Sequence, residues 1–276
     1  MGQKSRTWIR RISTVILPVF LFLMIPTVGL WFSVLRDGQV SSIVTTVLSD
    51  KNVQGDISNE LVKNLQDEKN GAKKSEVGKY QGDLVIALSN QLAQSSTQEK
   101  LGNVAETVFK AVTSGAKTVD VDPTPLVDDL VSAINSVKGI PSISRNDLGE
   151  IKPVVLGKDK ALPDLSPVRK GLTLAGLLTF LLSLLCLFLV YKTSNTPYRG
   201  IGIHFIVLGT LWSIAVFAGL KVLISKLETG LQADAIPVAA SAVLGGIRII
   251  ALTLVILGIG AIVAHFKFYK KEVFAK

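Results

Sequence analysis

The chain has 276 residues, of which 48% are hydrophobic and 18% charged, and its formal net charge at pH 7 is +9. This basic excess does not indicate nucleic-acid binding, because it lies in segments that are too short to fold a reader domain. The single cysteine, Cys186, excludes a disulfide within the chain.

Four apolar segments are each long enough to cross a bilayer, which requires about 20 apolar residues per helix. We expect transmembrane helices at 12–35, 171–191, 200–222 and 243–266. The first segment is longer than the apolar core of a signal peptide, and no A-x-A-like cleavage site follows it. It is therefore expected to remain in the chain as a membrane span.

Basic residues near the ends of these segments predict their orientation. The N-terminus at 1–11, the loop at 192–199 and the tail at 267–276 together contain ten basic residues and one acidic residue. Because basic residues close to span ends are retained in the cytoplasm, both termini are expected there. The protein is thus predicted to lie in the plasma membrane, with 36–170 and the loop at 223–242 outside.

The fold class expected for the whole chain is a mainly α membrane protein with a mostly helical extracytoplasmic domain at 36–170. Within this domain apolar residues recur at helical spacing in five stretches, 40–48, 53–65, 77–92, 101–112 and 126–137. The first stretch is expected to continue the first span outward as one amphipathic helix.

Several residues in this domain are typical of helix ends. Ser96 with Glu99 indicates a capping box, Gly115 and Gly139 indicate C-termini, and Pro125 indicates a first turn. The alternating piece at 118–122 and extended pieces at 140–144 and 153–157 predict a small strand element. The segment at 67–76, rich in lysine, asparagine and glycine, predicts a mobile loop.

The stretch from Asp50 to Ser58 raises the question of a metal site. It places oxygen-bearing side chains at alternate positions around Gly55, as a calcium-binding EF-hand loop does. The last loop position, where an EF-hand has a bidentate glutamate, holds Leu61 instead. The apolar spacing favours a helix with Ser49 or Asp50 at its N-cap, and a weak calcium site is the alternative.

Residues for nucleophilic or metal chemistry are sparse outside the membrane. Both histidines, His204 and His265, fall near the predicted cytoplasmic ends of spans. The carboxylate pairs, Asp120 with Asp122 and Asp128 with Asp129, are expected on a solvated face or in capping roles. A Ser-Lys nucleophile at Ser41 or Ser42 remains open, but no motif selects it. We therefore assign no catalytic, cofactor-binding or metal-binding residue and expect no cofactor.

Apart from Lys221 at the edge of the third segment, Arg248 is the only fixed charge within the predicted spans. An ionisable residue in a membrane segment is a functional candidate by default. Counting back from Lys267 along the helix places Arg248 at the outer interface, which favours an anchor over a ligand or gate residue.

The order of parts resembles a family of four-span actinobacterial integral membrane proteins of uncharacterised function. Three segments carry the resemblance: VLSDKNVQGDISNELV, VDVDPTPLVDDLVSAI and LPDLSPVRKGLTLAGLL. The resemblance covers nearly the whole chain and implies a helix at 49–66, but it carries no functional residues.

These observations predict a non-enzymatic membrane protein of the bacterial cell envelope, whose outside domain binds a protein, lipid or wall component. Its expected partners are the lipid bilayer and a protein in the membrane or envelope. One alternative is a subunit of a transport complex, since ABC permeases share this topology. The loop at 192–199 is short for the coupling helix that such permeases present to their ATPase. A second alternative is an extracytoplasmic Ser-Lys or carboxylate hydrolase.

Overall fold

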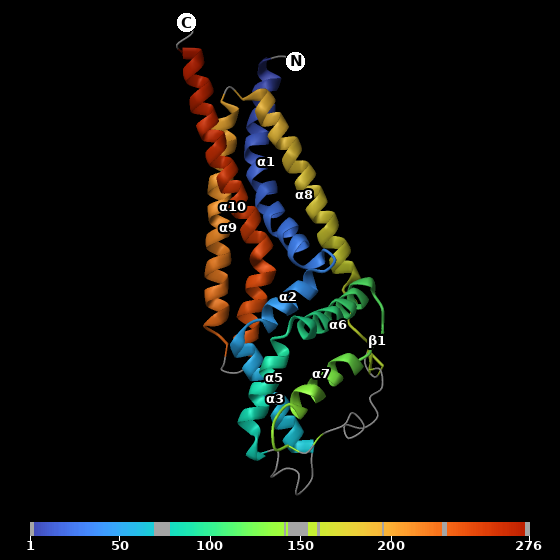
Figure 1. Cartoon of the computed structure of the whole chain (residues 1–276). Coiled ribbons are helices and arrows are strands. Elements are labelled where there is room, and N and C mark those ends of the chain that lie inside the picture. The colour runs from blue at the N-terminus through green and yellow to red at the C-terminus, as the bar shows by residue number, and fades with distance from the viewer. Residues whose placement is uncertain are drawn as a thin grey trace. The chain divides into compact units, whose positions relative to one another are not determined.

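The computed structural model describes residues 3–68, 78–140, 142, 154–158, 161–194, 196–227 and 231–273. The chain is mainly helical and divides into two compact units (Figure 1). The span unit consists of Met1–Arg36, Val168–Leu223 and Val243–Lys276, and the head unit of Asp37–Pro167 and Ile224–Ala242.

Long apolar helices build the span unit. They are α1 (Gln3–Leu30), which ends in the π-helical turn η1 (Trp31–Leu35), α8 (Ser166–Thr193), α9 (Pro197–Ile224) and α10 (Leu231–Val273). The described residues include four helical segments that are long and apolar enough to cross a membrane: Thr7–Leu35, Ser166–Thr193, Pro197–Ile224 and Ala233–Lys267. The sequence prediction of four helices that are long and apolar enough to span a membrane is confirmed.

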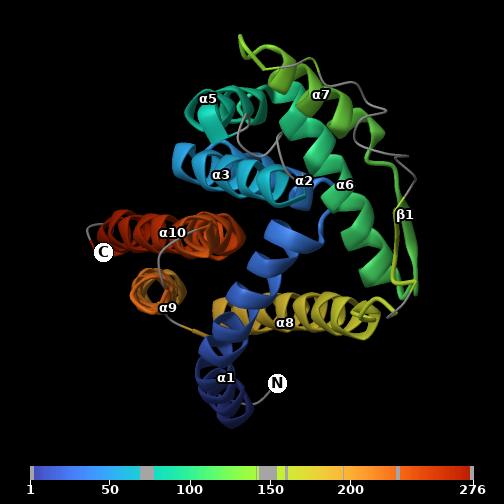
Figure 2. The same cartoon turned by 90° about the horizontal axis from the view of Figure 1, so that it is seen from below.

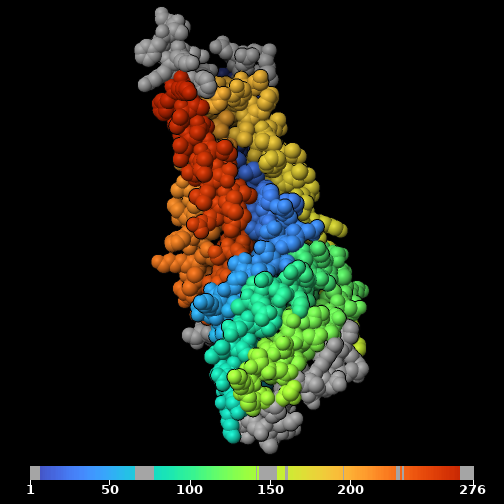
Figure 3. Space-filling model, in the orientation of Figure 1, coloured from blue at the N-terminus to red at the C-terminus, as the bar shows by residue number. Residues whose placement is uncertain are grey.

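Small residues allow the helices of the span unit to approach closely, as is common in membranes. Gly202 of α9 faces Gly258 of α10, and Gly209 faces Ala251. A Cβ atom at Gly209 would lie 2.5 Å from the carbonyl oxygen of Ala251. Figures 1 and 3 show α9 and α10 side by side along their lengths.

The first span is held to α9 and α10 by polar contacts as well as by packing. The indole nitrogen of Trp212 in α9 donates a hydrogen bond to the carbonyl oxygen of Phe22 in α1 at 3.1 Å. The backbone nitrogen of Gly246 in α10 donates to the Ser33 hydroxyl of η1 at 2.8 Å. Leu17, Leu21 and Ile25 of α1 are fully buried in the resulting core.

The head unit contains α2 (Gln39–Leu48), α3 (Lys51–Glu68), α5 (Gln81–Leu92), α6 (Ser95–Ser114) and α7 (Thr124–Asn135). Its apolar core joins three of these helices, α3, α5 and α7, which lie next to one another in Figure 2. The helical spacing of the apolar residues explains this, since one face of each helix is buried. The buried core residues are Val62, Leu84, Leu88, Ala133, Ile134 and Val137.

A two-stranded antiparallel sheet completes the head unit. Strand β1 (Val119–Val121) pairs with β2 (Val154–Leu156), with Val119 opposite Leu156. The predicted extended pieces at 118–122 and 153–157 are thus confirmed for the described residues. The piece at 140–144 and the loop at 67–76 lie largely outside the described residues.

The expectation that the first span continues outward as one helix is wrong. The chain leaves the helical path at Arg36 and turns at Gly38, whose φ is +81°, before α2 begins. Such a positive φ is accessible to glycine without the steric cost of a Cβ atom. A carboxylate from α6 caps the new helix: Glu106 accepts hydrogen bonds from the backbone nitrogens of Gly38 at 2.9 Å and Ser41 at 3.3 Å.

Two further sequence expectations are corrected. The predicted capping box of Ser96 and Glu99 does not form, because α6 begins at Ser95 and its N-cap, Gln94, makes no side-chain cap bond. The segment at 223–242, expected as a loop, is helical from Leu231 onward. Residues favourable to helix, such as the alanines at 239 and 240, extend α10 well beyond the apolar stretch that predicted the span.

Candidate functional site

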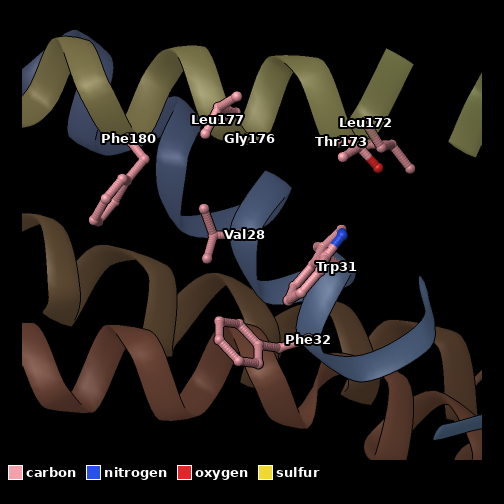
Figure 4. A pocket seen from close by; sticks show the side chains of 8 residues that line it. All are labelled: Val28, Trp31, Phe32, Leu172, Thr173, Gly176, Leu177 and Phe180. Atoms are coloured by element: carbon pink, nitrogen blue, oxygen red, sulfur yellow. The ribbon is translucent and has the colours of Figure 1, made fainter. Parts of the chain in front are cut away.

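An apolar groove lies between α1–η1 and α8 within the span unit. Its volume is about 420 Å³. Trp31 and Phe32 from η1 and Phe180 from α8 surround the same gap (Figure 4). The residues that line it are Val28, Trp31, Phe32, Leu172, Thr173, Gly176, Leu177 and Phe180.

The π turn supplies the aromatic wall of the groove. The backbone nitrogen of Arg36 bonds to the carbonyl oxygen of Trp31 at 3.1 Å, five residues back, which is the π-helical pattern. Such a turn inserts one extra residue relative to an α-helix, and here two consecutive aromatic residues line the groove. Their rings meet edge to face, with centroids 5.2 Å apart.

Small and hydroxyl-bearing residues bring α1 and α8 into contact beside the groove. Gly176 is buried, and a Cβ atom there would lie 3.8 Å from the backbone of Thr27. The hydroxyls of Thr27 and Thr179 are 3.4 Å apart. These contacts hold α1 and α8 together beside the groove-lining residues Val28 and Gly176.

Polar groups in the groove are few. The Thr173 hydroxyl donates to the carbonyl oxygen of Arg169 at 2.8 Å within α8, so its hydrogen is already engaged. The indole N–H of Trp31 makes no hydrogen bond to any residue that the structure describes. The groove consequently suits an apolar ligand that carries a hydrogen-bond acceptor close to Trp31.

Basic residues lie close in the chain to the groove-lining residues of η1 and α8. Arg36 follows Phe32 by four residues, and Arg169 precedes Gly176 by seven, which places Arg169 on the groove-lining face of α8. Lys170 comes next in the chain. Among the described residues, none of these three cations has an ion-pair partner.

Arg248, the charge predicted as an anchor, lies on α10 with its side chain exposed. Gly246, two residues earlier, bonds to Ser33 in η1, so Arg248 stands close to the level of the π turn. The apolar helical segment Ala233–Lys267 extends on both sides of Arg248. Arg248 is not among the residues that line the groove.

The Asp50–Ser58 stretch is helical rather than an open loop. Asp50 accepts hydrogen bonds from the backbone nitrogens of Asn52 at 2.9 Å and Val53 at 3.4 Å, which makes it the cap of α3. The prediction of a capped helix is confirmed, and Gly55 lies inside that helix. The alternating oxygens therefore point to different sides of α3 and do not converge as ligands of one ion.

The carboxylate pairs predicted as capping or solvated groups have structural roles. Asp129 forms an ion pair with Lys100 at 2.8 Å and accepts a hydrogen bond from Thr97 at 3.0 Å. Asp122 accepts from the backbone nitrogen of Thr124, at the start of α7, at 2.9 Å. Asp120 and Asp128 are exposed. The structure therefore places Asp129 and Asp122 in stabilising contacts.

The remaining candidates are likewise engaged in packing. Ser41 packs against Gly102, where an added Cβ would collide with its hydroxyl. His204 contacts the carbonyl oxygen of Gly200 through Nδ1 at 2.7 Å within α9. Among the described residues, no group of three or more His, Cys, Asp or Glu side chains could hold a metal ion.

The groove and the Glu106 cap were not predicted from the sequence. Nothing local to 28–32 shows that α8 lies opposite. Glu106 interrupts the apolar pattern of α6, and its capping of a helix 65 residues earlier is visible only in the folded chain.

No protein-family model, curated protein or solved structure matches this chain.

Proposed function

We propose that the chain is a non-enzymatic multi-pass protein of the bacterial cell envelope that binds a membrane lipid in the groove between α1–η1 and α8. The observation that carries this proposal is the groove itself: about 420 Å³, lined almost wholly by apolar side chains, and formed by two helices apolar enough to span a membrane. This volume lies within the range of roughly 300–1,000 Å³ that is typical of small-molecule sites.

The chemistry of the groove favours a lipid over the other ligands expected for an envelope protein. A wall polymer carries many hydroxyl and amide groups, which would lose their hydrogen bonds to water in such an apolar site. An acyl chain has no such cost. A lipid chain also reaches the groove directly from the surrounding bilayer.

In the same proposal, the head unit lies outside the cell, where it can contact a protein partner. The connection between α8, which ends at Thr193, and α9, which begins at Pro197, favours binding over transport. It is too short for a coupling helix that would receive motion from a cytoplasmic ATPase.

Fluorescence quenching can test the proposal because Trp31 lines the groove and the chain has three tryptophans in all. The variant W8F/W212F retains Trp31 alone. In mixed detergent micelles, a phospholipid with brominated acyl chains should quench Trp31 at low mole fraction and then reach a plateau. If Trp31 met only bulk lipid, its quenching would instead rise in proportion to the mole fraction of brominated lipid.

Two matched variants in the same background control for nonspecific effects. T173F/L177F adds aromatic rings inside the groove, whereas L174F/L178F adds them to exposed positions of α8 that do not line it. The first variant should lose the saturable quenching and the second should keep it. Equal quenching curves for both variants would contradict lipid binding in the groove.

A further inference from the structure

We infer that the groove selects a phospholipid with a net negative headgroup, whose phosphate is held by Arg36 and Arg169. This inference rests on the proposed function, because it concerns the headgroup of the lipid whose chain occupies the groove. The juxtaposition that supports it is an apolar groove whose lining residues on η1 and α8 are followed and preceded by cations without an ion-pair partner among the described residues.

The two arginines are positioned by the elements that build the groove. Arg36 is the residue at which the π turn ends, and its side chain is exposed. Arg169 shares a face of α8 with Gly176, and its side chain is half-buried. Arginine is suited to this role, since its planar guanidinium can donate two parallel hydrogen bonds to phosphate oxygens.

The balance of charge at this end of the span unit favours an anion. Arg36, Arg169 and Lys170 are the cations next in the chain to the groove-lining residues Phe32 and Leu172, and none has an ion-pair partner among the described residues. Two acids are near in sequence, Asp37 and Asp164. Asp164 already accepts a hydrogen bond from the backbone nitrogen of Ser166 at the start of α8, at 2.9 Å.

Trp31 links the two halves of such a ligand. Its ring lines the apolar groove, and its indole N–H has no partner among the described residues. Tryptophan is enriched at the level of the headgroups, where its ring is apolar and its N–H can bond to a polar group. The ester carbonyl of a phospholipid lies between chain and phosphate and would supply that acceptor.

The test compares two brominated phospholipids with the same acyl chains, phosphatidylglycerol and phosphatidylcholine, on the full-length W8F/W212F protein. Phosphatidylglycerol should reach half-maximal quenching of Trp31 at a lower mole fraction than phosphatidylcholine. The expected difference is roughly fivefold for each arginine that contributes, which is the effect of one basic residue on binding to an anionic membrane surface. This difference should shrink at about 1 M salt, where charges are screened over about 3 Å.

The decisive variant is R36Q/R169Q. It should lose the preference for phosphatidylglycerol, so that the two lipids quench at similar mole fractions. The matched control is K192Q/R199Q, which removes the same number of positive charges. These residues lie at the C-terminal end of α8 and the N-terminal end of α9, away from the groove-lining part of α8, and the variant should retain the preference.

The outcomes separate this inference from the proposed function. Saturable quenching of equal strength by both lipids, or a preference that survives in R36Q/R169Q, would overturn the headgroup assignment while lipid binding stands. Absence of saturable quenching by either lipid would overturn both the headgroup assignment and lipid binding in the groove. The same holds if the protein has the mass of a dimer and a second copy covers the groove.

Discussion

Glu106 shows how a single side chain connects two parts of the head unit that are distant in sequence. Its carboxylate accepts hydrogen bonds from the first turn of α2 and lies 3.5 Å from the Lys110 ammonium, and the side chain is only 12% exposed. A negative charge at a helix N-terminus satisfies free N–H groups and interacts favourably with the helix dipole. The carboxylate thus stabilises both the turn at Gly38 and the start of α2.

Replacing Glu106 with glutamine should destabilise the head unit at neutral pH. The amide can still accept a hydrogen bond, but the charge is lost, and hydrogen bonds to charged groups contribute about 1.5–3 kcal/mol each. We expect a loss of about 1–2 kcal/mol in the free energy of unfolding of E106Q, measured by thermal or chemical denaturation of the full-length protein. E99Q, at an exposed position of α6, should unfold like the unmodified chain.

The same residue predicts a dependence of stability on pH. Burial raises the pKa of Glu106, but the hydrogen bonds from Gly38 and Ser41 and the charge of Lys110 outweigh it and lower the pKa below its ordinary value of 4.5. The stabilisation is therefore complete above pH 4.5 and is lost as the pH falls through the folded-state pKa. Melting curves of the unmodified protein and E106Q should converge in that range, and a constant difference between them would contradict the assignment.

At the scale of helices, the α9–α10 pair depends on residues without bulky side chains. The contacts Gly202–Gly258 and Gly209–Ala251 are seven residues apart on each helix. A repeat of seven keeps one face of each helix on its partner over several turns. Between helices in lipid, apolar burial gives little driving force, and close packing of helix backbones contributes instead.

Substitution of two glycines on α9 should separate packing from helix propensity. At Gly209 an added Cβ would lie 2.5 Å from a backbone oxygen, whereas at Gly219 no atom lies within 4 Å. We expect G209A to lower the free energy of unfolding by about 1–3 kcal/mol, the usual cost of overpacking. G219A should be neutral or slightly stabilising, since alanine favours helix. Equal melting temperatures for the two variants would show that α9 and α10 do not pack at Gly209.

At the scale of the whole chain, the two units differ in the polarity of their exposed side chains. The helices of the span unit expose many large apolar side chains, including Leu177 at 56% and Ile249 at 67%. In water such surfaces would be unfavourable, but in a bilayer they contact lipid. In the α3 and α6 helices of the head unit, by contrast, buried positions are interspersed with exposed positions that carry polar side chains.

The predicted orientation can be tested by thiol labelling in whole cells. In a C186A background, S132C on the exposed face of α7 should react with an impermeant thiol reagent, because the head unit is expected outside. S194C, between α8 and α9, should react only after the membrane is permeabilised. The reverse pattern would contradict the orientation inferred from the basic residues.

The sequence alone determined the features that depend on neighbours along the chain. Apolar spacing predicted the buried residues Leu84, Leu88 and Leu92, which lie on one face of α5. The cap of α3 was predicted at Ser49 or Asp50, and Asp50 serves this role because the N–H groups that it bonds are two and three residues away. The four spans were predicted because membrane crossing requires a minimum length of apolar helix, which can be read directly from composition.

The tertiary structure alone decided the features that depend on the distance between helices. The groove exists because the aromatic residues of η1 lie opposite Gly176 and Leu177 of α8, more than 140 residues later in the chain. The cap of α2 is Glu106, which lies 68 residues after Gly38 in the chain. Local spacing determines which face of a helix is apolar, but not which other helix covers it or where a gap is left.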